Sequence, residues 1–214
     1  MLLVFDIETM PTNDSEIIQS FADTIKPPAN YSKPETIAKW MEENKEQALK
    51  ELVAKTSFDG LYGRVACIAW KHEDKEVDSS LATDSEGDAI ERFYSSIPNG
   101  QITFCGHNVA GFDLPFLKHR SIILGIKPPK SIMQAMNAKP WDSCIADTML
   151  MWSSDRDKRT SMDKLCRAFG IAGKGDFNGS MVAETWPIDP QRVIDYCKDD
   201  AIRTEAIYNR IAFL

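Results

Sequence analysis

The chain has 214 residues, of which 43% are hydrophobic and 27% charged, and its formal net charge is −7 at pH 7. This length suits one compact domain and the composition is typical of soluble globular proteins, which excludes wholesale disorder and fibrous repeats. The acidic balance also excludes a protein that coats nucleic acid through bulk positive charge, although it is compatible with local basic tracks.

The apolar runs and the cysteines bear on the location of the protein. The longest apolar runs, such as residues 65–70, are too short to cross a bilayer, so we expect no signal peptide and no membrane segment. Five cysteines are widely spaced without a CxxC pair, which favours buried, reduced thiols and a cytoplasmic protein. No histidine pairs with a cysteine or another histidine at ligand spacing, which argues against a zinc site.

The first elements are predicted from periodicity and turn signals. Residues 2–7 (LLVFDI) are apolar and β-branched, which predicts a buried strand. Residues 11–30 are turn-rich, and Ser32 with Glu35 has the spacing of a capping box that opens a helix to about Lys55. The apolar positions of this helix fall on one stripe, so we expect it to lie over the core or to flank a groove.

The middle of the chain alternates between strand and helix signals. Residues 64–72 and 76–83 predict two strands joined as an antiparallel hairpin. A helix over about residues 85–96, a short strand at 102–105 and a helix at 113–124 are expected to follow. Gly125 is a plausible stop for that last helix.

The last part of the chain is predicted to be mostly helical. Prolines and polar residues indicate a loop at 127–140, and helices are expected near residue 148 and at 162–169, 181–186 and 190–211. No repeat or linker divides the chain, so we expect one domain over residues 1–214. The order of elements predicts an α/β fold in which helices cover both faces of a mixed central sheet.

Two acidic residues, Asp6 and Glu8, lie at the end of the first predicted strand. Residues two apart on a strand project from the same face, so the two carboxylates point together, about 7 Å apart. A divalent cation would explain these like charges, because carboxylate oxygens hold Mg²⁺ and two such ions about 4 Å apart cleave phosphodiesters. The alternative is that the strand emerges into solvent and both carboxylates are hydrated.

A further carboxylate, Asp113, follows the segment GHNVAGF between a predicted strand and a predicted helix. At a helix N-terminus Asp serves first as a capping residue, and Asn108 and the glycines suit a turn. The same placement puts Asp113 at the carboxyl edge of a strand, where ligands of open α/β sheets bind. The capping role and the ligand role are compatible.

On the final predicted helix Tyr196 and Asp200 stand four residues apart, so the phenol and the carboxylate share one face. Asp195 and Asp199 repeat this spacing on the neighbouring face. A solvated acidic surface is the alternative for the first pair and our expectation for the second. We expect Asp147 to cap the helix that follows it.

Three motifs occur in order along the chain, namely VFDIET, GHNVAGFDLPFL and YCKDDAIRT, with GKGDFNGS before the last. The sequence resembles the DEDDy branch of the DnaQ-like 3′–5′ exonucleases, and more narrowly the stand-alone predicted exonucleases related to the proofreading domain of family-B DNA polymerases. The resemblance covers residues 1–10 and 100–214 and implies a ribonuclease H-like fold with about five strands. Residues 11–60 do not align, and we interpret them as a helical insertion.

The resemblance also implies catalytic residues, which are Asp6, Glu8, Asp113, Tyr196 and Asp200. The four carboxylates would bind two divalent ions, Mg²⁺ or Mn²⁺. Asp6 would bridge both ions, Glu8 and Asp200 would hold the ion that activates water, and Asp113 would act mainly on the second ion. Tyr196 would orient the nucleophile, because a phenol with an ordinary pKa of about 10 is a poor general base at neutral pH.

Substrate contacts are expected at Thr9 and Met10, which match the place where relatives contact the terminal nucleotide, and at the nearby Asn108 and Phe112. Core packing is the alternative for Phe112, and His107 is expected to be a turn or core residue. The expected partner is a single-stranded nucleic-acid 3′ end, DNA in preference to RNA, and the expected product is a nucleoside 5′-monophosphate. The remaining alternatives are an exoribonuclease and a catalytically silent module that binds nucleic acid or acts as an adaptor for a protein partner.

The distribution of charge adds one more expectation. Residues 101–180 hold 11 basic and 7 acidic residues and so reverse the sign of the whole chain. We expect their basic side chains to form a track for the phosphate backbone of the substrate. The residues of this expected track are Lys118, Arg120, Lys127, Lys130, Lys139, Arg156, Lys158, Arg159 and Lys174.

Overall fold

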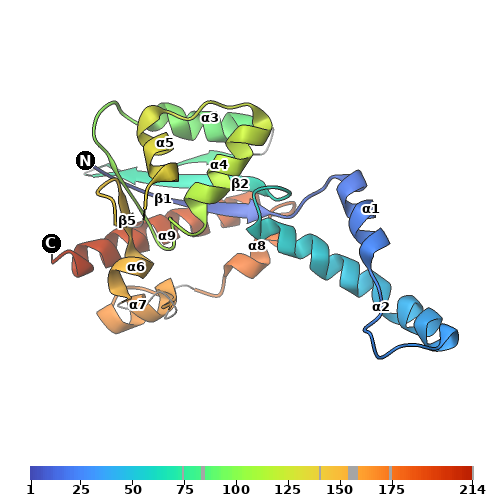
Figure 1. The fold of residues 1–214 in the computed structure, drawn as a ribbon. Coiled ribbons are helices and arrows are strands. Elements are labelled where there is room, and N and C mark those ends of the chain that lie inside the picture. The colour runs from blue at the N-terminus through green and yellow to red at the C-terminus, as the bar shows by residue number, and fades with distance from the viewer. Residues whose placement is uncertain (74, 83–84, 140, 154–158, 174, 214) are drawn as a thin grey trace.

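A computed structural model describes residues 1–73, 75–82, 85–139, 141–153, 159–173 and 175–213. Its centre is a five-stranded sheet with the order β3-β2-β1-β4-β5 (Figure 1). The middle strand β1 (Leu2–Met10) pairs antiparallel with β2 (Arg64–His72) and parallel with β4 (Thr103–Gly106). At the edges, β3 (Asp78–Leu81) pairs antiparallel with β2, and β5 (Ile145–Asp147) pairs parallel with β4. The predicted mixed sheet is therefore confirmed.

Helices cover both faces of the sheet, as predicted (Figure 1). On one face lie α3 (Glu86–Ser96), α4 (Asp113–Leu124) and α5 (Lys130–Asn137), which share an apolar core with Leu3, Phe5 and Ile7 of β1. The long helix α9 (Pro190–Ile211) crosses the other face. The period of two along β1 sends Leu3, Phe5 and Ile7 into the first core, so Asp6 and Glu8 point towards the α9 side.

Shorter helices surround α9 on its side of the sheet. They are α6 (Thr148–Trp152), α7 (Met162–Phe169), the 3₁₀ turn η2 (Gly179–Met181) and α8 (Val182–Thr185). The predicted helices at 113–124, 162–169 and 190–211 match α4, α7 and α9. Gly125 ends α4 with φ 68°, the left-handed conformation that glycine adopts without cost.

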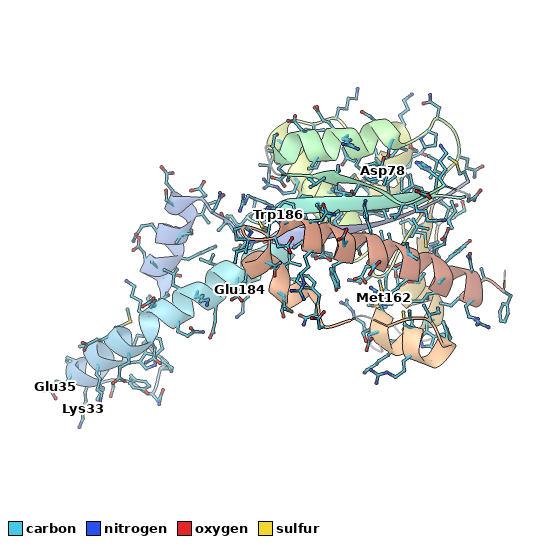
Figure 2. The ribbon with its side chains drawn as sticks, turned by 180° about the vertical axis from the view of Figure 1, so that it is seen from behind. Lys33, Glu35, Asp78, Met162, Glu184 and Trp186 are labelled. Atoms are coloured by element: carbon cyan, nitrogen blue, oxygen red, sulfur yellow. The ribbon has the colours of Figure 1, made fainter. Side chains whose placement is uncertain are left out.

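The segment between β1 and β2 forms an arm that projects from the sheet (Figure 1). It consists of α1 (Ser15–Thr24), α2 (Pro34–Lys55) and the 3₁₀ turn η1 (Thr56–Phe58). Lys33 and Glu35 lie at the far end of the arm, while Glu184 and Trp186 of the α8 region lie near its base (Figure 2). No residue of α2 is buried, so the expectation that this helix lies over the core is wrong. Its apolar stripe is only half-buried, and α1 packs against α2 instead.

Several predicted boundaries are also wrong, for local reasons. Ser32 does not cap α2, because the capping position is Lys33 and Pro34 occupies the first turn, where it needs no N–H partner. The turn-rich region contains α1, whose first N–H groups are capped by Asp14. The expected loop at 127–140 contains α5, a short helix stabilised by tertiary burial of Ile132 and Ala135 rather than by propensity.

The strands differ from expectation at their ends. β1 runs three residues past the predicted boundary to Met10, with an irregularity in its pairing between Glu8 and Thr9. The three-residue strand β5 was not predicted as a strand, because it is too short to show a period. None of the five cysteines forms a disulfide, as expected, and all but Cys144 are buried. Among the described residues, none of the helices combines the length and apolarity needed to cross a membrane.

Candidate active site

Three carboxylates meet where β1 passes under α9. Oxygens of Asp6, Glu8 and Asp200 all lie within 4.8 Å of one another. Asp6 and Glu8 are half-buried, and Asp200 is 4% exposed. Negative charges this close together repel one another, and partial burial strengthens the repulsion. The arrangement therefore favours either protonation of a carboxylate or a bound cation.

The position of α9 follows from its capping and its apolar face. Asp189 accepts a hydrogen bond from the backbone N–H of Arg192, and Pro190 occupies the first turn. Val193, Cys197 and Ala201 are buried against β2 in one apolar cluster. The Cys197 thiol also donates to the backbone oxygen of Asp6 at 3.4 Å, so the helix is fixed directly over the acidic strand.

Tyr196 lies one turn before Asp200 and faces the same cluster. Its side chain is buried, and its ring makes an edge contact with Phe177, with 5.0 Å between centroids. Burial, and next the charge of Asp200, raise the pKa of the phenol well above its ordinary value. The phenol is thus a hydrogen-bond donor at neutral pH and not a base.

Asp113 reaches the site from the start of α4. Its Oδ1 accepts a hydrogen bond of 3.1 Å from the backbone N–H of Ile7, the residue between Asp6 and Glu8. The capping position of α4 belongs to Phe112, so the expected capping role of Asp113 is wrong. Burial raises the pKa of Asp113 to about 7. Asp113 lies outside the cluster of three oxygens but lines the same pocket.

Asp147 organises the loop that leads to Asp113. As expected it caps the helix after it, because its Oδ1 accepts from the N–H groups of Met149 and Leu150 at 3.0 and 3.2 Å. The same carboxylate accepts from Asn108 through Oδ1 and from Ala110 through Oδ2, each at 3.0 Å. Asp147 is 1% exposed, so four hydrogen bonds compensate for the burial of its charge. The sequence indicated the cap but not its second role.

A pocket of about 420 Å³ opens over the carboxylates. Of the residues expected to contact substrate, Thr9, Asn108 and Phe112 line it. Met10 is not among the lining residues and packs against the apolar cluster on the α9 side. Ser57 and Phe58 of η1 also line the pocket. Their place in the site was not predicted, because they belong to no motif.

His107 lies at the rim of this pocket but is engaged in structural contacts. Its Nδ1 is 2.9 Å from the hydroxyl of Thr148, and its Nε2 is 3.0 Å from the backbone oxygen of Thr160. The ring thereby connects the end of β4 to α6 and to the segment before α7. This agrees with the expected turn or core role.

Arg203 supports Asp200 from the next turn of α9, a contact that was not predicted. Its guanidinium donates to Asp200 Oδ1 at 2.8 Å, to Asp199 Oδ2 at 3.3 Å and to the backbone oxygen of Ala172 at 3.3 Å. Asp195 and Asp199 are exposed, as expected.

The expected basic track is only partly compatible with the structure. Arg120 is buried and forms two hydrogen bonds of 2.8 Å with Glu86, so it is unavailable to a phosphate and its assignment to the track is wrong. Lys118 donates to Asn137 on α5. Arg156, Lys158 and Lys174 lie outside the described residues.

The donor set of the cluster fits divalent cations that prefer oxygen. Asp6, Glu8 and Asp200 supply only carboxylate oxygens, with no thiolate or imidazole among them. Such a hard donor set suits Mg²⁺ or Mn²⁺ and disfavours zinc. A bound cation would also relieve the repulsion within the cluster.

Comparisons with known proteins bear on the family and the fold of this chain. Residues 62–214 match the family described as predicted 3′–5′ exonucleases related to the exonuclease domain of PolB. No curated protein matches the chain. The structure is similar to a family B DNA polymerase from the hyperthermophilic archaeon Pyrobaculum calidifontis, with a TM-score of 0.60 and 18% identity over 99% of this chain and 24% of the polymerase chain. The chain thus spans about a quarter of that polymerase, and the likeness confirms the ribonuclease H-like fold.

Proposed function

This chain belongs to the family of predicted 3′–5′ exonucleases related to the exonuclease domain of PolB, and from that membership we propose a specific activity. The protein hydrolyses phosphodiester bonds at single-stranded 3′ ends, with DNA as the preferred substrate, and releases nucleoside 5′-monophosphates. The activity depends on two divalent ions, Mg²⁺ or Mn²⁺.

The observation that carries the proposal is the meeting of Asp6, Glu8 and Asp200 within 4.8 Å in a pocket that Asp113 also lines. Asp6, Glu8 and Asp200 would hold the ions, and Asp113 would reach the second one partly through water. When bound, two such ions activate a water molecule and stabilise the negative charge on the departing 3′ oxygen. This chemistry needs little acid–base work from the protein, which agrees with the structural role of His107.

The surrounding side chains position the reactants. The Tyr196 phenol stays protonated and donates a hydrogen bond, so it would orient the nucleophile. The Thr9 hydroxyl donates to the backbone oxygen of Ser57 at 2.6 Å, which leaves its oxygen as an acceptor for the terminal 3′-OH. Asp147 holds the loop that carries Asn108 and Phe112. These two side chains would contact the terminal nucleotide.

The direction of digestion tests the proposal. A single-stranded DNA oligonucleotide labelled at its 5′ end should give a ladder of stepwise shortened products with Mg²⁺ or Mn²⁺ and none with EDTA. The same oligonucleotide labelled at its 3′ end should release the labelled mononucleotide at once. A ladder from the 3′-labelled oligonucleotide, together with immediate release of the label from the 5′-labelled one, would contradict the assigned polarity.

DNA is the proposed substrate because the matched family is related to a DNA polymerase domain. Two-metal cleavage itself does not distinguish deoxyribose from ribose, and only contacts to the 2′-OH do so. Digestion of an RNA oligonucleotide of matched sequence decides the question. Faster shortening of RNA than of DNA would replace the DNA preference with exoribonuclease activity.

A further inference from the structure

Phe58 is an exposed aromatic side chain at the rim of the carboxylate pocket. The residue is 75% exposed, although it lines the same pocket as Asp6 and Glu8. Among the described residues, no other exposed large hydrophobic side chain lines this pocket. A large apolar surface kept in water beside a polar site indicates a binding surface more than a packing residue.

The turn that carries Phe58 is fixed to the acidic strand. Thr9 Oγ1 donates to the backbone oxygen of Ser57 at 2.6 Å, and the backbone N–H of Thr12 donates to Thr56 Oγ1 at 2.9 Å. The Thr56 hydroxyl in turn donates to the backbone oxygen of Val53 at 2.6 Å, which joins η1 to the end of α2. Thr9 follows Glu8 directly, so these bonds hold the backbone of η1 beside the strand that carries the carboxylates.

An exposed aromatic ring on an ordered turn suits one class of ligand group, the nucleobase. Every nucleobase has a π face, and aromatic side chains bind bases of single strands by stacking with little dependence on sequence. Since the turn is already ordered by its hydrogen bonds, binding loses little conformational entropy there. A charged phosphate would gain little from the same apolar ring.

We propose that Phe58 is the stacking platform for a base near the 3′ end of a single-stranded nucleic acid. The inference rests on the proposed function for the identity of the ligand, but Phe58 lies outside residues 62–214, the part of the chain that matches the family. The arm between β1 and β2 thereby contributes a substrate contact of its own. Base stacking does not involve the 2′-OH, so Phe58 strengthens binding of DNA and RNA alike.

Substitution at Phe58 tests this role by binding and by kinetics. Phe58→Ala should raise the Kd for a fluorescent single-stranded oligonucleotide, measured by anisotropy in EDTA and again with Ca²⁺, by about tenfold. The KM for digestion should rise similarly while kcat changes less than about twofold. Phe58→Trp should retain wild-type affinity. Phe213→Ala, which removes a ring that is 95% exposed and does not line the pocket, is the matched control and should change neither value.

An oligonucleotide with abasic sites at its 3′-terminal positions separates stacking from a structural role. Wild type and Phe58→Ala should bind it equally, because there is no base to stack. The proposal would be overturned if Phe58→Ala bound the intact oligonucleotide as tightly as the wild type does. It would also be overturned if the substitution weakened binding of the intact and the abasic oligonucleotide by the same factor. Binding that depends on Phe58 in a protein that digests no oligonucleotide would uphold it and refute the exonuclease activity instead.

Discussion

The carboxylate of Asp113 accepts a hydrogen bond from the backbone N–H of Ile7, with 3.1 Å between oxygen and nitrogen. Ile7 stands between Asp6 and Glu8, so this bond ties the start of α4 to the part of β1 that carries the acidic pair. The bond also holds Asp113 in a buried position, where its charge is unfavourable until a cation compensates it.

Asp113→Asn should stabilise the protein in EDTA at alkaline pH. Burial raises the pKa of Asp113 from 3.8 to about 7. The contribution of the protonated Asp113 to the free energy of unfolding is therefore complete below about pH 4 and is lost as the pH rises through 7. Asn keeps an oxygen for the Ile7 N–H without the charge. We expect an increase of about 4 kcal/mol in the free energy of unfolding at pH 8 and almost none at pH 4. Denaturant unfolding at both values measures it, and a loss of stability at pH 8 would contradict the account.

Divalent ions should stabilise the wild-type protein, because ions that bind only the folded state shift the unfolding equilibrium. At 100 times the Kd, Mn²⁺ should add about 2.7 kcal/mol to the free energy of unfolding. Asp200→Asn should abolish most of this increment, whereas Asp195→Asn on the exposed face of the same helix should keep it. Thermal unfolding with Mn²⁺ and with EDTA gives the comparison, and equal increments in both variants would place the ions elsewhere.

Tyr196→Phe should slow turnover without weakening metal binding. The ring remains against Phe177, so only the phenol hydrogen bond is removed. We expect kcat to fall by about 10- to 100-fold, in the range of one positioned hydrogen bond, with an unchanged increase in Tm on addition of Mn²⁺. An unchanged kcat would remove Tyr196 from the proposed catalytic residues.

Asp147→Asn should remove one hydrogen bond from the loop before Asp113, the one donated by the backbone N–H of Ala110. The Asn oxygen can still accept from Asn108, Met149 and Leu150, but its NH₂ group cannot accept from the N–H of Ala110. The unsatisfied amide should cost about 1–3 kcal/mol of stability. Hydrogen exchange should accelerate at Ala110 more than at Asn108, and equal acceleration at both would indicate general unfolding of the loop.

The sequence predicted those parts of the site that depend on local periods. The spacing of Asp6 and Glu8 on a strand, and of Tyr196 and Asp200 on a helix, required only the geometry of one element. The order of the motifs, through the family resemblance, then indicated that these elements meet.

Contacts between distant segments could not be predicted in this way. Arg120 pairs with Glu86, 34 residues earlier in the chain, and no local pattern distinguishes this arginine from one that binds phosphate. Phe58 lines the pocket because hydrogen bonds from Thr9 and Thr12 hold η1 beside the end of β1, more than 40 residues earlier in the chain. The loop prediction at 127–140 also failed, because α5 is too short to show a clear period and depends on burial of Ile132 and Ala135.

The most direct test of the central claim compares three proteins in one digestion assay. Wild type, Asp6→Ala and Asp195→Ala each digest the same 5′-labelled single-stranded oligonucleotide. Asp6 belongs to the carboxylate cluster, whereas Asp195 is an exposed acid on α9, so the two substitutions remove the same charge in different places. We expect wild type and Asp195→Ala to produce the same Mg²⁺-dependent ladder and Asp6→Ala to be slower by about 10³-fold or more. Digestion by Asp6→Ala at the wild-type rate would show that these carboxylates are not the catalytic centre.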